Sequence, residues 1–260
     1  MTHTTEILTS FASHILSFAR THNPPLPNLI GIELLNEPQP GAHGDTLKEW
    51  YRGAFRAIRA IDPNLPIYIG DCWMPEEYAA FAKSASTPFV VLDHHLYRCF
   101  TAGDIATPAA EHARRLRDRN AGTPAAFARA RGELEGAGGA LIVGEWSAAL
   151  NPGSLQGVGG DGERGAKRDF VEAQLALFEE HCAGWFFWTY KKEKGRDTGW
   201  SFRDAVDAGV IPASLGGRQL GVSRGIQGRD ERKAKARDSA LGAFASAGTL
   251  MATELTGRPR

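Results

Sequence analysis

The chain has 260 residues, of which 42% are hydrophobic and 23% charged, and its formal net charge is zero. This length is enough for one large or two small domains with a sizeable core. The balanced charge gives no indication of a nucleic-acid partner or of binding to an acidic membrane surface. No apolar run approaches the roughly 18 residues that cross a bilayer, so no membrane partner is expected. The polar N-terminus is not a signal peptide, which makes an intracellular location the default expectation.

The three cysteines are far apart in the sequence and odd in number. This pattern argues against a disulfide framework, and it lacks the spacing of a zinc site. We therefore expect no metal and no cofactor. The three are Cys72, Cys99 and Cys182.

Apolar periodicity predicts helices that alternate with short buried strands. Pro24 to Pro27 end the first helix, because proline cannot continue one. Thr46 and Glu49 have the spacing of a capping box at the start of the second. Strands are predicted at 29–35, 66–70, 89–92, 140–143 and 185–189. Helices are predicted at 6–20, from Thr46 to 61, at 75–83, twice within 104–136 with a break near 120–124, and at 167–181, 203–209 and about 229–247. Residues 151–165 read as a glycine-rich loop, and about 248–260 as a frayed tail.

The alternation of strands and helices predicts a parallel sheet. Polar residues follow the carboxyl ends of several strands, which favours a (β/α) barrel over a doubly wound sheet. A complete barrel has eight strands, and only five are found here. The predicted fold class is therefore α/β, an incomplete (β/α)8 TIM barrel of about five C-terminal strand–helix units. Residues 1–260 form one partial domain in this interpretation.

Two of the predicted strands end at a glutamate. The run from Ile30 to Leu35 is followed by Asn36-Glu37-Pro38, and the strand at 140–143 leads to Glu145. Two carboxylates at strand ends suit glycoside hydrolysis, which needs an acid for the leaving oxygen and a second carboxylate that attacks or activates water. The alternative interpretation of Glu37 is an ordinary solvated loop residue.

Polar and aromatic side chains near these strand ends are candidate substrate-binding residues. His95 and Tyr97 are placed to orient the two acids, and Tyr97 is expected to lie near Glu145. The alternative for His94 and His95 is a hydrogen-bonded pair at a strand end. Trp185 and Phe186 are expected in the core. The candidate substrate-binding residues are Asn36, Trp73, His95, Tyr97, Trp146 and Trp188.

Two other interpretations were weighed against the glycosidase. Gly157, Gly159 and Gly162 match a dinucleotide-binding pattern by letter, but a proline-containing loop precedes them where the motif needs a strand. Asp93, His94 and His95 contain metal-ligating groups, but adjacent strand residues point to opposite faces. A metal-dependent hydrolase would need the two histidines to converge with acids from other strands.

The sequence resembles glycoside hydrolase family 5, and most of all its fungal exo-1,3-β-glucanase-like members. Four stretches carry the resemblance in family order, over roughly residues 5–215: 30–38, 93–97, 143–149 and 184–189. The resemblance implies a retaining mechanism in which Glu37 is the general acid/base and Glu145 the nucleophile. It also implies that Asn36 contacts the sugar 2-hydroxyl, that His95 and Tyr97 line the subsite, and that Trp188 forms its floor.

The chain departs from the family pattern at its start, because three strands that normally precede the Asn-Glu-Pro strand are absent. We therefore expect a truncated barrel, poorly soluble or self-associating through its exposed sheet edge and weak in activity. The predicted partner is a β-glucan or oligosaccharide substrate. The alternative function is a non-catalytic carbohydrate-binding remnant that keeps the aromatic floor without a complete subsite.

Overall fold

The computed structural model describes residues 2–23, 29–39, 41, 44–212 and 215. The predicted helix at 229–247, the predicted tail at 248–260 and the prolines at 24–27 lie outside this part of the chain. The chain forms two compact units. The first comprises the residues up to His94 together with Arg129–Leu141, and the second comprises His95–Ala128 together with the residues from Ile142 onward.

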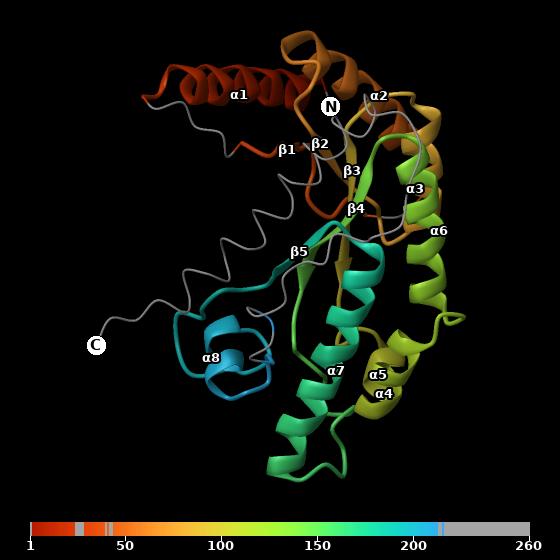
Figure 1. The fold of residues 1–260 in the computed structure, drawn as a ribbon, viewed down its shortest axis with the longest axis vertical. Helices are drawn as coiled ribbons and strands as arrows, with labels where there is room; N and C mark the ends of the chain where they lie inside the picture. Colours follow the sequence, from red (N-terminus) through yellow and green to blue (C-terminus); the bar gives the residue numbers. More distant parts are fainter. Residues whose placement is uncertain (1, 24–28, 40, 42–43, 213–214, 216–260) are drawn as a thin grey trace, which may run out of the picture. The chain divides into compact units, whose positions relative to one another are not determined.

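Helices and parallel strands alternate through the described residues, as the sequence predicts (Figure 1). The strand order is β1-β2-β3-β4-β5, which is the order in the chain. The strands are β1 (Ile32–Glu33), β2 (Ile67–Gly70), β3 (Val90–Leu96), β4 (Ala140–Trp146) and β5 (Gly184–Phe187). The helices are α1 (Thr2–Thr21), α2 (Gly44–Ile61), α3 (Pro75–Ser84), α4 (Ala102–Ala106), α5 (Ala109–Arg117), α6 (Gly122–Gly136), α7 (Gly160–His181) and α8 (Phe202–Asp207).

In the first unit, β2 pairs in parallel with β1 and β3, and Gly70 lies opposite Asp93. Helices α2 and α3 meet through an aromatic cluster of Tyr51, Phe55, Tyr78 and Phe81. All four side chains are buried, so this cluster is a main part of the unit's core.

Helix α1 packs on α2, where the indole of Trp50 donates a 2.9 Å hydrogen bond to Thr5. Its apolar residues do not all face this contact. Ala12 and Leu16 are buried, whereas three large apolar side chains of the same helix are more than half exposed. These are Ile7, Phe11 and Phe18.

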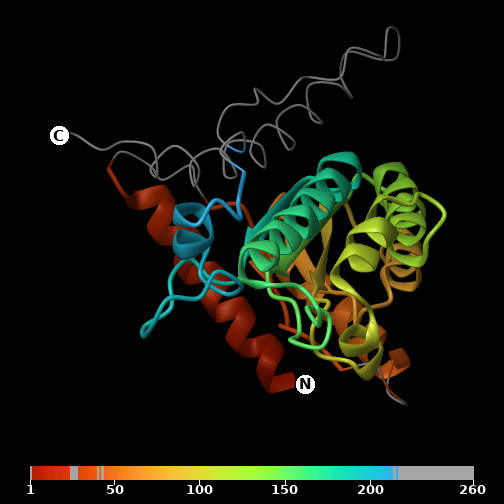
Figure 2. The same ribbon diagram turned by 90° about the horizontal axis from the view of Figure 1, so that it is seen from below.

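In the second unit, α7 lies beside α5, as Figure 2 shows. The predicted start of α7 at residue 167 is wrong, because the helix begins at Gly160 inside the segment predicted to be a loop. An ion pair four residues apart joins this start to the predicted helix, since Glu163 contacts Lys167. The helix thus includes a glycine-rich sequence that apolar periodicity does not identify.

Other boundaries also differ from the predictions. The predicted break near 120–124 is confirmed between α5 and α6, but a third helix, α4, precedes them. Thr101 and Asp104 cap α4 reciprocally in a capping box. The capping box predicted at Thr46 is wrong, because α2 begins at Gly44 and Thr46 lies inside the helix.

The first predicted strand is shorter than expected, since only Ile32 and Glu33 are paired as a strand. Ile32 and Leu34 are buried but Glu33 is exposed, so β1 is not buried on both faces. Beside it, a side chain at Gly31 would lie 2.4 Å from the ring of Tyr68, and Gly31 has a φ of 152°. Only glycine allows this close approach of the two strands.

Candidate active site

The Asn36-Glu37-Pro38 segment follows β1 without continuing the strand. Asn36 is exposed and Glu37 is half-buried. Glu37 has a φ of 42°, a left-handed conformation that is uncommon for a residue other than glycine. Such strained residues persist where the surrounding structure holds them, often at functional sites.

Gly70 gives this segment its place against the end of β2. A Cβ atom at Gly70 would lie 2.7 Å from Cδ of Pro38 and 3.3 Å from the carbonyl oxygen of Leu35. The absence of a side chain at Gly70 therefore lets Pro38 pack directly on the strand. Pro38 is buried, so its packing on Gly70 places the backbone of the adjacent Glu37. Glu37 departs from the extended conformation that is usual before a proline.

The turn after β2 presents the first candidate tryptophan. Cys72 and Trp73 have φ values of 52° and 59°, and the indole of Trp73 is 41% exposed. The carboxylate of Asp71 accepts a 2.8 Å hydrogen bond from the backbone N–H of Trp73. Trp73 is thus accessible to a ligand from a turn that Asp71 holds.

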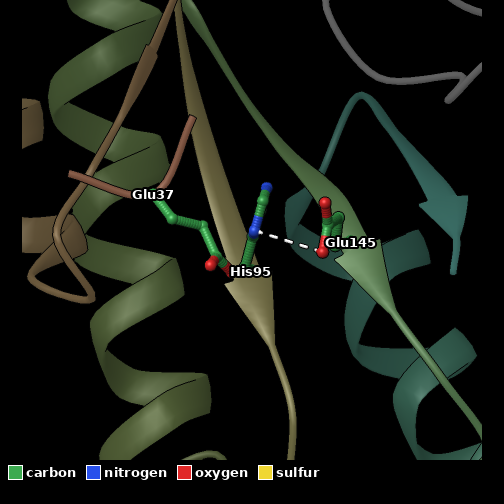
Figure 3. Close-up of side chains that lie close together, drawn as sticks. All are labelled: Glu37, His95 and Glu145. Atoms are coloured by element: carbon green, nitrogen blue, oxygen red, sulfur yellow. Dashed lines mark ion pairs between the residues drawn. The ribbon is translucent and has the colours of Figure 1, made fainter. Parts of the chain in front are cut away.

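Glu145 is the centre of a polar group in the second unit. The hydroxyl of Tyr97 donates a 2.7 Å hydrogen bond to Oε2 of Glu145. Nδ1 of His95 lies 3.5 Å from the same oxygen, and Figure 3 shows this pair between β3 and β4. His95 is buried, whereas Glu145 is only partly buried and can be reached from solvent. The expected proximity of Tyr97 to Glu145 is confirmed, while the catalytic roles stay predictions.

His94 and His95 turn to different partners. Nδ1 of His94 lies 2.6 Å from the carboxylate of Asp71, whereas His95 faces Glu145. This divergence follows from the alternation of side chains along β3. The two histidines therefore do not share a ligand position.

Trp146 is a core residue, which corrects its prediction as a substrate-binding side chain. Its side chain is fully buried and makes edge-to-face contacts with Phe178, Trp185 and Phe187. The strand β4 continues through Trp146, and its pairing with β5 is irregular between Val143 and Trp146. Glu145 is only partly buried whereas Trp146 is fully buried, so of the two only Glu145 can be reached from solvent.

In strand β5, a side chain that the sequence predicts to lie in the core is exposed. Phe186 was expected in the core but is 42% exposed, and Trp188 is 53% exposed. Trp185 and Phe187, on the other side of the strand, contact Trp146 and are half-buried. Phe186 and Trp188 share the face that lacks these contacts, because they lie two residues apart.

Trp188 and the segment around Trp200 are joined through the backbone. The N–H of Trp188 donates to the carbonyl of Trp146 at 2.8 Å, and the N–H of Thr189 donates to the carbonyl of Trp200 at 2.8 Å. These bonds attach the candidate subsite floor to the strand that carries Glu145. The expected position of Trp188 at an accessible strand end agrees with this geometry.

An aromatic cluster that sequence reasoning missed lies next to Tyr97. The rings of Phe100 and Trp200 lie 5.4 Å and 5.6 Å from the ring of Tyr97, and 5.8 Å from each other. Phe100 is 66% exposed. Flat, accessible rings of this kind can stack on sugar faces. Phe100 follows Tyr97 by three residues at the strand end, which is the signal that could have identified it.

Asp197 organises the loop that carries Trp200. Burial raises the pKa of this carboxyl. Hydrogen bonds from Lys192 and from the backbone N–H groups of Gly199 and Trp200 lower the pKa by more than burial raises it, so the net shift is downward. The Lys192 ammonium lies 2.9 Å from Oδ2 of Asp197. The ionised form of Asp197 therefore stabilises the loop.

The thiol of the nearby Cys99 is mostly protonated at neutral pH. Burial raises the pKa of the Cys99 thiol to about 11, so the thiolate is scarce at neutral pH.

Within the described residues, no helix combines the length and apolar character needed to cross a membrane.

Comparison with known proteins identifies the family. The profile described as Cellulase (glycosyl hydrolase family 5) matches residues 7–194. The chain belongs to this family, and its five parallel strand–helix units form part of the family's (β/α)8 barrel.

Several fungal proteins are similar to the chain. A glucan 1,3-beta-glucosidase 3 of Schizosaccharomyces pombe is 35% identical over 71% of this chain and 36% of its own length. A glucan 1,3-beta-glucosidase of Yarrowia lipolytica is 30% identical over 74% of this chain and 50% of its own length. An uncharacterized glycosyl hydrolase of Saccharomyces cerevisiae is 27% identical over 76% and 37%. The chain thus spans half or less of the length of these relatives.

Proposed function

We propose that the chain is a retaining glycoside hydrolase that acts on β-glucan, with β-1,3-linked glucan or a β-glucoside as its substrate. The observation that carries the proposal is the group around Glu145, where Tyr97 and His95 both face one carboxylate oxygen. The names of the relatives from S. pombe and Y. lipolytica support the choice of a 1,3-linked glucan.

In the proposed mechanism, Glu37 protonates the glycosidic oxygen while Glu145 attacks the anomeric carbon. A covalent glycosyl-enzyme forms, and the leaving sugar departs with the proton. Water that Glu37 activates then displaces Glu145, and the sugar is released with retention. Carboxyl groups about 5–5.5 Å apart are the requirement for this double displacement.

The residues around Glu145 have separate parts in this proposal. The hydroxyl of Tyr97 holds the carboxylate in one orientation and supports its negative charge before attack. His95 is a second polar contact of the same oxygen and restricts its movement. Trp188, Trp73 and Asn36 bind the sugar, the first two by stacking and the third by hydrogen bonding.

The test is hydrolysis of an aryl β-glucoside and of a soluble β-1,3-glucan by the purified chain and its Glu145→Gln variant. We expect turnover with retained anomeric configuration by the parent, and a loss of at least about 1,000-fold in the variant. Glu49→Gln, on the exposed side of α2, is the matched control and should keep the parent's rate. Equal turnover by the parent and Glu145→Gln would contradict the proposed nucleophile.

The second candidate function is a non-catalytic carbohydrate-binding remnant. It is favoured by the exposed aromatic side chains Trp73, Phe100 and Trp188, which can stack on a sugar without hydrolysing it. A folded parent that binds a β-1,3-glucan oligosaccharide without hydrolysing it would support this function over the first.

Self-association is a further part of the proposal, and the sheet edge expected from the sequence is joined by a second candidate surface on α1. The exposed side chains Ile7, Phe11 and Phe18 form an apolar row on α1, and such rows tend to be covered by a partner. Light scattering of the parent and of Phe11→Lys tests this. A parent mass of two chains or more that falls in the variant supports it, and a monomeric parent contradicts it.

A further inference from the structure

A buried ionisable pair joins the turn after β2 to β3, and neither of its residues is among the candidate site residues. Asp71 follows β2 and His94 lies within β3, and their side chains meet at 2.6 Å, Oδ2 to Nδ1. Asp71 is only 3% exposed and His94 only 6%. Burying a carboxylate and an imidazole is costly unless they are paired, so each side chain depends on the other.

The remaining groups of Asp71 hold the turn after β2. Oδ1 accepts the N–H of Trp73 at 2.8 Å, and the carbonyl oxygen accepts the N–H of Met74 at 2.8 Å. Cys72 and Trp73 are both left-handed in this turn. Such conformations are unfavourable for residues other than glycine and persist only where the surroundings fix them. Asp71 supplies those contacts and so determines where the indole of Trp73 lies.

The same residue extends the pairing between β2 and β3. Its N–H donates to the carbonyl of Asp93 at 3.2 Å, one position beyond the end of β2. His94 is the next residue on β3 and is held by the side chain of Asp71. Because side chains alternate along a strand, fixing His94 on one face fixes His95 on the other. Tyr97 lies two residues further, directly after the strand.

We propose that Asp71 and His94 form a positioning pair that sets the orientation of two adjacent strand ends. At one end it places Trp73 for contact with substrate, and at the other it places His95 and Tyr97 toward Glu145. The pair touches neither substrate nor the reacting atoms. Its catalytic part rests on the proposed glycosidase function, whereas its structural part does not.

The structural part is tested by hydrogen–deuterium exchange on the purified chain. We expect Asp71→Ala and His94→Gln to speed exchange by at least tenfold in peptides covering 71–74 and 91–97. Asp71→Asn keeps an acceptor for the N–H of Trp73, so it should restore protection at 71–74 and remain faster at 91–97. Trp50→Phe, which removes a half-buried hydrogen bond elsewhere in the first unit, is the control.

Unchanged exchange at both segments in Asp71→Asn and His94→Gln would overturn the proposal. Acceleration that spreads equally over the whole chain would also overturn it, because that pattern reports general destabilisation. These two variants are conservative in size, so the measurement does not depend on whether Asp71→Ala folds.

The catalytic part is tested by a double-variant cycle on the aryl β-glucoside. We expect Asp71→Asn to lower kcat about tenfold with KM changed less than about twofold, since small misplacements of catalytic groups cost this much or more. If the pair acts through Tyr97, then Asp71→Asn should lower kcat less than threefold in a Tyr97→Phe background. If Asp71→Asn lowers kcat by the same factor in the Tyr97→Phe background as in the parent, this part is overturned. A parent without turnover would refute the proposed function, and the exchange result would then decide the positioning pair alone.

Discussion

The hydroxyl of Tyr97 donates a 2.7 Å hydrogen bond to Oε2 of Glu145, so a residue just beyond β3 holds a carboxylate near the end of β4. The ring of Tyr97 contacts those of Phe100 and Trp200, which also contact each other. This support limits the rotation of the phenol and keeps the hydroxyl directed at Glu145.

Tyr97→Phe removes this bond and keeps the aromatic contacts. A hydrogen bond to a charged group contributes about 1.5–3 kcal/mol, and each 1.4 kcal/mol is tenfold in rate. We expect kcat on an aryl β-glucoside to fall by about 10- to 100-fold with little change in KM. Tyr190→Phe, which removes an exposed phenol hydroxyl after β5, is the control and should keep the parent's kcat. A Tyr97→Phe enzyme with the parent's kcat would show that the bond is dispensable.

Gly70→Ala tests how the segment carrying Glu37 is placed. The new methyl would meet the ring of Pro38 and the carbonyl of Leu35 at distances that require one of them to move. Overpacking of this kind costs about 1–3 kcal/mol, so we expect a lower thermal midpoint and a lower kcat. Gly53→Ala in α2 has open space around the new methyl and should be neutral or stabilising. Equal effects of the two substitutions would contradict the packing argument.

The sequence predicts the alternation of elements well because each strand is a short apolar run between turn residues. It predicts strand ends less well, since pairing with a neighbour decides where a strand stops. β3 continues to Leu96 through Asp93, His94 and His95, whose polar groups have partners that only the folded chain supplies.

In the candidate site, too, some features follow from the local sequence and others depend on the folded chain. The sequence predicts Glu37, Glu145 and Tyr97 as candidates because each lies at or just beyond the end of a strand, and the proximity of Tyr97 to Glu145 is the part that the structure confirms. The different positions of Trp146 and Trp188, one in the core and one exposed, depend on strand register. Composition and spacing do not give strand register. A shift of one residue turns a side chain to the other face of its strand, so register decides whether a tryptophan lies in the core or at the surface.

Trp188→Ala tests the proposed floor of the sugar subsite. The indole is 53% exposed, so removing it should disturb the core little while deleting a stacking surface. Covering an aromatic ring with a ligand is worth about 1.5–3 kcal/mol, so we expect binding of a β-1,3-glucan oligosaccharide to weaken by about 10- to 100-fold. Calorimetric titration measures this. Phe186→Ala lies on the same face of β5 and separates the loss of a general apolar surface from the loss of a specific floor.

The loop that carries Trp200 should loosen in acid. Asp197 has a pKa below its ordinary value of 3.8, because Lys192 and the N–H groups of Gly199 and Trp200 favour the ionised carboxylate more than burial opposes it. A folded-state pKa that is lowered contributes stability above the unfolded value, and this contribution is lost as pH falls through the folded pKa.

We therefore expect the local stability of the loop to be constant above about pH 5 and to decrease below about pH 4. Tryptophan fluorescence during acid titration reports the change through Trp200. Asp197→Asn should show the loosened signal already at pH 7 and should lose most of the pH dependence. Glu193→Gln, an exposed carboxylate of the same loop, is the matched control and should titrate like the parent. An Asp197→Asn protein whose fluorescence follows the parent at every pH would show that this carboxylate does not hold the loop.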